Sequence, residues 1–251
     1  MTNEQDTNKI KIAKFLAQCG LGSRRHCEEL VEEGRIRVNG RRMTNVAERI
    51  DPDTDIVEHA GKRLQPATKA VFALYKPVGY ISTLSDPHAS LTIAELIPAK
   101  YRGLGLKPVG RLDKESEGLM LLTNDGQLAN KLTHPRYGVT KVYLVKLDNP
   151  PPDRILHVIR KGAHLPRERR LRPMGVCVVG RGPEAARDIE LTLREGRKHE
   201  IRRVFGMFGY NVLKLKRIAM GTFELGRISK GQLVRLTDGQ VRKLREACGL
   251  D

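Results

Sequence analysis

The stretch GRLDKESEGLMLLTNDG, residues 110–126, places one carboxylate, Asp113, just before a glycine-hinged apolar run, with Arg111 two residues ahead of it. A lone aspartate on a basic protein is usually a partner in a surface salt bridge, and such pairs contribute little to stability. Asp113 is therefore either a surface charge or a site carboxylate, and the rest of the sequence must decide between them.

A second stretch with the residue types for chemistry is REGRKHEIRR, which carries five cations within ten residues. These cations are Arg194, Arg197, Lys198, Arg202 and Arg203. At helical spacing Lys198 and Arg202 share a face, while Arg203 points elsewhere. One cation can therefore face Asp113 while the others face an anionic partner. His199 has the type of a general base, but a single histidine without a positioned partner is more often a hydrogen-bonded structural residue.

Several other chemistries lose support because their motifs are absent from the sequence. There is no GxxxxGK[ST], no HExxH and no GxSxG, and GLGLKPVG lacks the GxGxxG spacing. The four cysteines are scattered without a CxxC pair, which supports neither zinc nor a disulfide framework. We therefore expect no metal and no cofactor.

The composition indicates a polyanionic partner. The 251 residues hold 46 Lys and Arg against 29 Asp and Glu, a net charge of +17, which favours nucleic acid. No apolar run is long enough to span a bilayer, and the polar start MTNEQDTNKI is unlike a signal peptide, so we expect a cytoplasmic protein without a membrane partner. The absence of Trp argues against a platform that stacks base after base.

The N-terminal segment predicts two short helices and a hairpin. Apolar residues at helical spacing are broken by Gly20 and Gly22, and Ser23 is placed to cap the second helix. Gly34 ends that helix, and IRVNGRR predicts a strand that enters an Asn-Gly turn. Residues 1–65 carry 12 basic and 11 acidic side chains, so any attraction for a polyanion here must come from one face.

The remaining chain predicts a second, larger domain. Residues 59–69 mix small, polar and Pro residues and are interpreted as a linker, and we place the domains at 1–65 and 66–251. Strands are expected at 71–76, 118–123, 141–147, 189–193, 212–220 and 232–237. Helices are expected at 125–132, 153–161, 198–208 and 238–248, with Asp125 and Asp238 as N-caps of the first and last. Strands outnumber helices and partly follow one another, which predicts an α+β domain with a mostly antiparallel sheet.

The first domain resembles the S4 RNA-binding module over about residues 9–64, and the run GLGSRRHCEELVEEGRIRVNG carries the resemblance. A helical hairpin with a solvated charged face is the alternative. The resemblance implies that the basic residues of the second helix and the hairpin contact RNA. These are Arg24, Arg25, Arg35, Arg37 and Arg41.

Four islands of the larger domain resemble the bacterial ribosomal-RNA pseudouridine synthases that carry an N-terminal S4 module, most of all the synthase B group that modifies large-subunit rRNA. The islands are LYKPVGYIST, GRLDKESEGLMLLTNDG, TKVYLV and REGRKHEIRRVFGMFGY, with LKLKRIAMG downstream. The departures are small: Ser116 stands where many members have Thr, and Glu200 where Gln is frequent. The resemblance implies the pseudouridine synthase fold, a mixed, mostly antiparallel sheet flanked by helices.

In that family the aspartate of GRLD is essential for turning uridine into pseudouridine, which implies this role for Asp113. Whether it attacks C1′ or removes a proton from C2′ stays open. Either role needs an ionised carboxylate, which a neighbouring cation favours. Arg202 matches the family arginine that pairs with the aspartate, with a phosphate clamp or a surface charge as alternatives. Tyr143 matches the tyrosine that packs on the target base, although a strand tyrosine is more often a core residue.

The target nucleotide must leave the helical stack before its glycosidic bond can react. Arg111 is suited to fill the vacated space or to hold the flanking phosphate. Further RNA contacts are expected from Lys76, Lys114, Arg197, Lys198 and Arg203.

The sequence thus predicts a two-domain, monomeric enzyme that isomerises one uridine of ribosomal RNA without a cofactor. Large-subunit (23S) RNA is favoured, and small-subunit (16S) RNA is the alternative. A non-catalytic S4-type assembly factor and a general basic RNA-binding protein remain as alternatives from another class. The intact set Asp113, Tyr143 and Arg202 counts against both.

Overall fold

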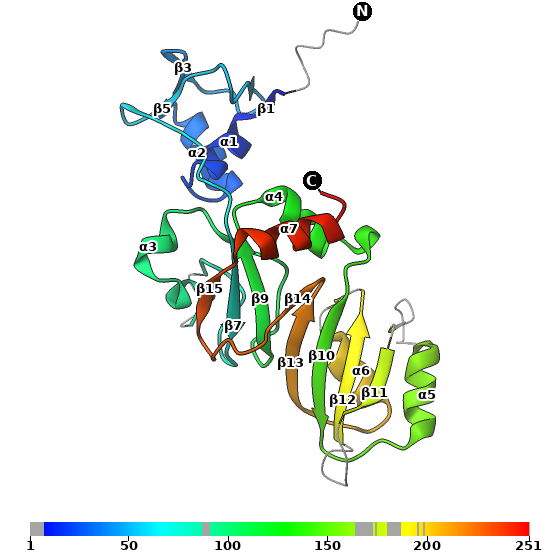
Figure 1. Ribbon diagram of the computed structural model, residues 1–251. Coiled ribbons are helices and arrows are strands. Elements are labelled where there is room, and N and C mark those ends of the chain that lie inside the picture. Colours follow the sequence, from blue (N-terminus) through cyan, green and yellow to red (C-terminus); the bar gives the residue numbers. More distant parts are fainter. Residues whose placement is uncertain are drawn as a thin grey trace, which may run out of the picture. The chain divides into compact units, whose positions relative to one another are not determined.

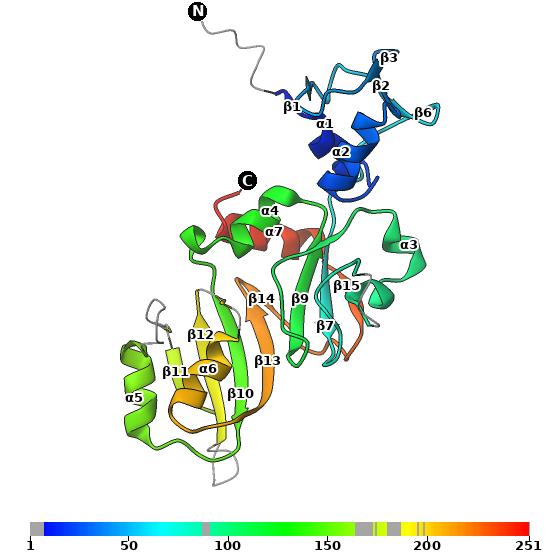
Figure 2. The same cartoon turned by 180° about the vertical axis from the view of Figure 1, so that it is seen from behind.

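The computed structural model describes residues 8–86, 91–163, 173, 175–179, 187–194, 196–197 and 199–250. The chain divides into two compact units, shown in Figures 1 and 2. Unit 1 comprises Met1–Ala70 and Pro98–Leu106, and unit 2 comprises Val71–Ile97 and Lys107–Asp251. The predicted division at residues 65 and 66 stays a prediction.

Unit 1 begins with two helices, as predicted. They are α1 (Ile12–Gln18) and α2 (Arg24–Glu32). The Ser23 hydroxyl caps α2 by accepting the His26 N–H at 3.1 Å, because the first N–H groups of a helix have no partner within it. The apolar side chains of both helices, among them Phe15, Leu16 and Val31, form the buried core of the unit.

Two hairpins complete this core. The first joins β2 (Ile36–Val38) to β3 (Arg41–Met43), and its turn residues Asn39 and Gly40 have φ of 50° and 78°, as a type I′ turn requires. The second joins β5 (Val57–His59) to β6 (Lys62–Arg63). The linker prediction is therefore wrong for residues 59–63, where backbone pairing outweighs a composition of small and polar residues. The short strands β1 (Ile10–Lys11) and β4 (Arg49–Ile50) pair with each other.

The segment Pro98–Leu106, with helix α3 (Ala99–Arg102), also belongs to unit 1. Glycines allow its close approach to the turn after α1. A Cβ atom on Gly20 would lie 2.8 Å from the carbonyl oxygen of Gly103. No local pattern in the sequence predicts this contact, since it joins glycines more than 80 residues apart.

The described strands of unit 2 form one sheet in the order β11-β12-β10-β13-β9-β7-β15, with β14 beside β13 and β8 beside β9. The strands are β7 (Val71–Lys76), β8 (Lys107–Pro108), β9 (Glu117–Thr123), β10 (Lys141–Leu147), β11 (Gly175–Val178), β12 (Asp188–Leu193), β13 (Val212–Met220), β14 (Phe223–Glu224) and β15 (Leu233–Arg235). The β9/β13 pair is parallel and the other described pairs are antiparallel. The predicted α+β class with a mostly antiparallel mixed sheet is confirmed.

The β9/β13 pair is short, with Glu117 opposite Lys216 and Gly118 opposite Arg217. Gly118 has φ of +108°, and a Cβ atom there would lie 2.2 Å from the Arg217 carbonyl oxygen. Glycine is therefore required where the two halves of the sheet join. The segment that precedes β9 carries Asp113 to this junction.

Helices cover the sheet on both sides of the junction. Among the described residues of unit 2, the α-helices are α4 (Gly126–Thr133), α5 (Asp153–Gly162), α6 (Glu200–Met207) and α7 (Asp238–Ala247), and the 3₁₀ turns are η2 (Ile93–Leu96) and η3 (Pro135–Tyr137). Helices α4 and α7 pack side by side against β7 and β9, where Leu128 and Leu244 join the buried core. Helix α6 covers one face of the β10, β12 and β13 part, and α5 flanks β11 (Figures 1 and 2).

The two predicted aspartate caps have different outcomes. Asp125 accepts the N–H groups of Gln127 and Leu128 at 3.0 and 3.2 Å, which confirms it as the cap of α4. The prediction is wrong for Asp238, because Thr237 caps α7 by accepting the Gln240 N–H. A threonine three residues before a glutamine forms a reciprocal capping box, which an aspartate one position later cannot form.

Within the described residues, none of the helices combines the length and the hydropathy that crossing a bilayer requires. The same residues contain no cluster of three or more His, Cys, Asp or Glu side chains arranged for a metal ion.

Candidate active site

A pocket of about 250 Å³ lies in unit 2 where the segment before β9 meets β10, β13 and the start of α6. It brings together side chains that are far apart in the sequence. The polar residues that line it are Arg111, Asp113, Ser116, Tyr143, Arg197, His199 and Glu200. The predicted residues Asp113 and Tyr143 therefore share one pocket, with Arg111 and Arg197 beside them.

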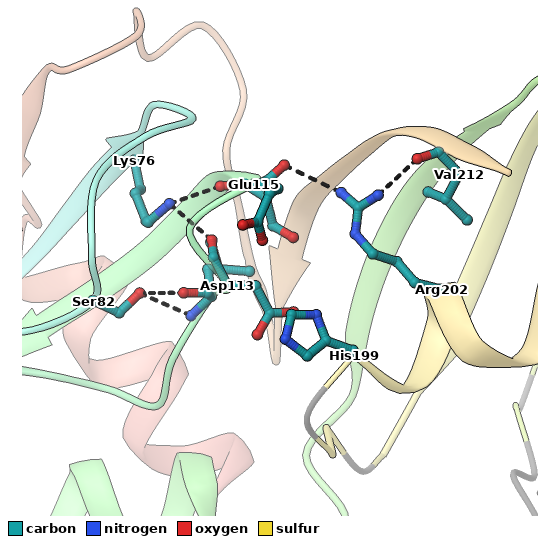
Figure 3. A network of polar contacts seen from close by, with 9 residues as sticks. Lys76, Ser82, Asp113, Glu115, His199, Arg202 and Val212 are labelled. Atoms are coloured by element: carbon teal, nitrogen blue, oxygen red, sulfur yellow. Dashed lines mark hydrogen bonds and ion pairs between the residues drawn. The ribbon is translucent and has the colours of Figure 1, made fainter.

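The Asp113 side chain is accessible from the pocket, since 26% of its surface is exposed. Its Oδ2 atom lies 3.5 Å from Nδ1 of His199. Its backbone carbonyl accepts hydrogen bonds from the Ser116 N–H at 3.0 Å and from the Lys76 amine at 3.1 Å. The backbone of the aspartate is thus held by hydrogen bonds, while its carboxylate lies beside the imidazole of His199 (Figure 3).

Lys76 lies at the end of β7 and is fully buried. Its amine donates to the carbonyl oxygens of Asp113 and Ser116 at 3.1 and 2.7 Å (Figure 3) and to the carbonyl oxygen of Pro77 at 3.1 Å. The prediction that Lys76 contacts RNA is wrong, because three carbonyls occupy its amine and no phosphate can reach it. Burial lowers the pKa of this amine from 10.5 to about 8, against the opposing attraction of Asp113.

Ser82 supports the same segment from the other side. Its hydroxyl donates to the Leu112 carbonyl at 2.6 Å and lies 3.0 Å from the Leu112 N–H, from which it accepts. Leu112 is buried and lines the pocket. Ser82 and Lys76 both come from the chain at or just after β7, so this part of the sheet fixes the backbone on either side of Asp113.

The predicted ion pair between Asp113 and Arg202 is not present. The Arg202 guanidinium donates to the carbonyl oxygens of Val212 and Glu115 at 2.7 and 3.2 Å (Figure 3). Arg202 projects from α6 toward β13 and the backbone at Glu115, while His199, three residues earlier, reaches the Asp113 carboxylate. Arg202 therefore ties the Asp113 segment to β13 through backbone contacts and leaves the carboxylate to the histidine.

Tyr143 lies in β10 opposite Leu191 of β12 and Arg217 of β13, and only 6% of its surface is exposed. The pairing with β13 shifts register between Val142 and Tyr143, and such irregularities often re-aim a side chain next to a site. The tyrosine is thus a buried sheet residue that also lines the pocket.

Comparison with known proteins agrees with this arrangement. The family model described as RNA pseudouridylate synthase matches residues 70–206, more than half of the chain, and the S4 domain model matches residues 10–56. The chain belongs to the RNA pseudouridine synthase family. All the residues that line the pocket except Leu215 lie within the part of the chain that matches the synthase model, and α1, α2 and the first hairpin lie within the S4 match.

Individual relatives cover nearly the whole chain. An uncharacterized RNA pseudouridine synthase of Aquifex aeolicus is 40% identical over 96% of this chain and 96% of its own length. Ribosomal large subunit pseudouridine synthase B of Bacillus subtilis is 34% identical over 94% of this chain and 95% of its own length. A solved pseudouridylate synthase structure superposes with a TM-score of 0.67 at 26% identity, covering 94% of this chain and 99% of that one.

In this pseudouridine synthase the predicted RNA-contacting cations of unit 2 differ in exposure. Arg111 and Lys114 are exposed beside Asp113, and Arg197 and Arg203 are partly buried. Arg197 lines the pocket, where its backbone N–H donates to Oε2 of Glu200 at 3.0 Å. Lys198 lies outside the described residues. The structure thus leaves Arg111 and Lys114 as the predicted cations most open to RNA in this unit.

The predicted cations of the S4 unit are all exposed. Arg35 pairs with Glu33 at 3.0 Å, and Arg37 donates to the Gly40 carbonyl at 3.1 Å. The others are Arg24, Arg25 and Arg41. Arg24 and Arg25 form the first turn of α2, where helix N–H groups point outward.

Two pocket residues, Ser116 and His199, are not among the functional residues that the sequence predicts. The buried hydroxyl of Ser116 has no hydrogen-bond partner within the described part of the chain, although buried polar groups are nearly always paired. The sequence favours a structural role for His199 because it shows no partner for the imidazole. That partner is Asp113, which is 86 residues away in the sequence and could not be found by local spacing.

Proposed function

We propose that this RNA pseudouridine synthase isomerises a uridine of large-subunit ribosomal RNA, with Asp113 as the reacting carboxylate. The observation that carries the proposal is the partly exposed Asp113 carboxylate in a pocket that Tyr143 also lines. The similarity to ribosomal large subunit pseudouridine synthase B of Bacillus subtilis supports the choice of large-subunit RNA.

The reaction conserves atoms and electrons. The N1–C1′ bond of uridine breaks, the uracil turns while it is held, a C5–C1′ bond forms, and the proton lost from C5 is balanced by one gained at N1. No oxidant, reductant or co-substrate is needed. Asp113 takes part either by attacking C1′ or by removing a proton from C2′, and both roles require the ionised form.

The size of the pocket suits one extruded nucleotide. Its volume of about 250 Å³ is below the ~300–1,000 Å³ typical of sites for drug-sized ligands. Tyr143 would pack on the uracil, and the apolar side chains of Leu112 and Leu215 line the same space. Exposed Arg111 would occupy the gap left in the RNA or hold the flanking phosphate, which offsets part of the cost of flipping.

The S4 unit would dock on the RNA through the α2 terminus and the first hairpin. Arg24 and Arg25 lie in the first turn of α2, where the helix dipole disfavours cations. A phosphate group bound at that end would contact both the arginines and the outward N–H groups. Its negative charge would offset the repulsion between the arginines and the positive end of the helix dipole. The exposed arginines of the hairpin extend this basic face.

We propose that the enzyme acts as a monomer, as predicted from the sequence. Ribosomal RNA as the substrate implies the cytoplasm as its place of action. The division into an S4-type domain (1–65) and a catalytic domain (66–251) belongs to the same proposal.

The test is to map pseudouridines in ribosomal RNA from cells with and without the gene. We expect loss of one modified site in 23S RNA, restored by the unaltered gene and by Asp153→Asn, an exposed α5 carboxylate outside the pocket, but not by Asp113→Asn. Loss of a 16S site instead would establish the small-subunit alternative. Unchanged ribosomal RNA would refute the proposed substrate.

A further inference from the structure

The residue that contacts the Asp113 carboxylate has an unusual backbone. His199 has φ of +52° and ψ of +21°, in the left-handed region. Residues other than glycine adopt this conformation at an energetic cost, and they are concentrated at functional sites. The conformation occurs at the residue immediately before α6, so the direction of the histidine side chain is fixed by the start of a packed helix.

The imidazole does not serve the helix that it precedes. His199 occupies the N-cap position of α6 but forms no side-chain cap, which is the usual stabilising role of a residue there. Its Nδ1 atom instead lies 3.5 Å from Oδ2 of Asp113. The two side chains are 38% and 26% exposed, so both remain accessible from the pocket.

We propose that His199 is a positioning residue that orients the Asp113 carboxylate through the ion-pair contact of its Nδ1 atom with Oδ2. This rests on the proposed role of Asp113. The backbone contacts from Lys76, Ser82 and Arg202 fix the segment around Asp113, but they leave the side-chain torsions of the aspartate free. The imidazole contact limits these torsions and leaves Oδ1 to face the substrate.

A histidine in this place makes the reaction sensitive to pH. An imidazolium donates a charge-assisted hydrogen bond, which is shorter and stronger than the bond from a neutral ring. The other charged or titratable groups around Asp113 include Arg111, Lys114 and Glu115 on its own segment, Tyr143 of β10, Arg197, Glu200 and Arg202 at or near the start of α6, and Lys76 behind its carbonyl. Arginines keep their charge at all physiological pH values, and the buried Lys76 amine, with a pKa of about 8, contacts the Asp113 backbone and not its carboxylate.

The experiment measures single-turnover release of tritium from RNA labelled at uridine C5, between pH 5.5 and 9. For the unaltered enzyme we expect the rate to fall toward high pH, because a neutral ring holds the carboxylate less strongly than a charged one. His199→Arg keeps a permanent donor and charge and should remove this decline. His199→Asn tolerates the left-handed backbone but carries no charge, and should be about tenfold slower at pH 6, without a decline, because misplacement of a reacting group is costly.

Two further variants separate positioning from folding. His199→Gly relieves any backbone strain and should be as slow as His199→Asn. His157→Asn, on the exposed side of α5, should keep the full profile. If His199→Asn and His199→Gly keep the rates and the pH profile of the unaltered enzyme while Asp113→Asn is inactive, the positioning proposal is wrong and the proposed function stands. An active Asp113→Asn enzyme would instead refute the role of Asp113 itself.

Discussion

The amine of Lys76 donates to the backbone carbonyl of Asp113 at 3.1 Å from a side chain that has no exposure to solvent. A second bond from the same amine reaches the Ser116 carbonyl at 2.7 Å. The turn that presents the aspartate is thus built around a buried cation. The two bonds from Lys76 limit the backbone flexibility of this turn, and so the position of the carboxylate, without contacting the carboxylate itself.

Replacing this cation should loosen the turn. We expect Lys76→Met to reduce the rate of pseudouridine formation by about tenfold or more, because misplacement of a reacting group is costly. Amide hydrogen exchange of residues 113–117 should become faster in the same variant. Lys243→Met removes an exposed lysine of α7 outside the pocket and should change neither quantity. Equal exchange rates in the two variants would contradict the structural role of Lys76.

The lowered pKa of Lys76 also predicts how stability changes with pH. The amine has a pKa of about 8 in the folded chain, against 10.5 as the unperturbed value. Between these values the unfolded chain binds more protons, so the free energy of unfolding should rise with pH, by at most about 1.4 kcal/mol per unit. Urea unfolding at pH 7.5 and 9.5 should show this gain relative to Lys76→Met. The same pH dependence in both proteins would show that the amine is not buried as described.

Ser116 should contribute to substrate binding through its hydroxyl. The hydroxyl is buried, lines the pocket and has no hydrogen-bond partner in the described residues. We expect Ser116→Ala to weaken kcat/KM by the value of one hydrogen bond, about 0.5–1.5 kcal/mol. Ser116→Thr keeps the hydroxyl and should retain more activity than Ser116→Ala. A Ser116→Ala enzyme with unchanged kcat/KM would mean that the hydroxyl does not meet the substrate.

The two arginines at the start of α2 should account for part of the salt dependence of RNA binding. Removing Arg24 and Arg25 together should weaken binding and reduce the slope of log K against log salt by about 2, one for each lost phosphate contact. The matched control removes the exposed pair Lys62 and Arg63 of β6 in the same unit. Equal slopes for the two double variants would show that charge number alone, and not the α2 face, determines binding.

The strands of unit 2 were largely predictable from the sequence. Strands β7, β10 and β13 begin and end at the predicted residues, because long apolar or alternating runs bounded by turn residues leave little choice of structure. Strand β6 was missed because it is two residues long and is defined by its pairing with β5. The packing of Pro98–Leu106 on unit 1 was also missed, since close approach between glycines leaves no pattern in the local sequence.

The sequence predicted which residues lie in the site better than it predicted the hydrogen bonds and ion pairs that these residues form. Motif resemblance selected Asp113 and Tyr143, and the structure places both in one pocket. The resemblance predicted an RNA contact for Lys76 and a partner for Asp113 that the structure does not show. The Lys76 amine is buried by carbonyls 37 and 40 residues away, and such contacts depend on tertiary structure. The choice between Arg202 and His199 likewise depends on where α6 begins. The left-handed backbone at His199 sets that start and cannot be read from residue types.

The most direct test of the account is the activity of Asp113→Asn on RNA. The substitution keeps the size of the side chain and the backbone contacts from Lys76 and Ser116 but removes the ionised carboxylate. We predict that tritium release from C5-labelled uridine falls to the uncatalysed level while RNA affinity stays close to that of the unaltered enzyme and of Asp153→Asn. Tritium release at an undiminished rate would contradict the central claim that the Asp113 carboxylate carries out the isomerisation.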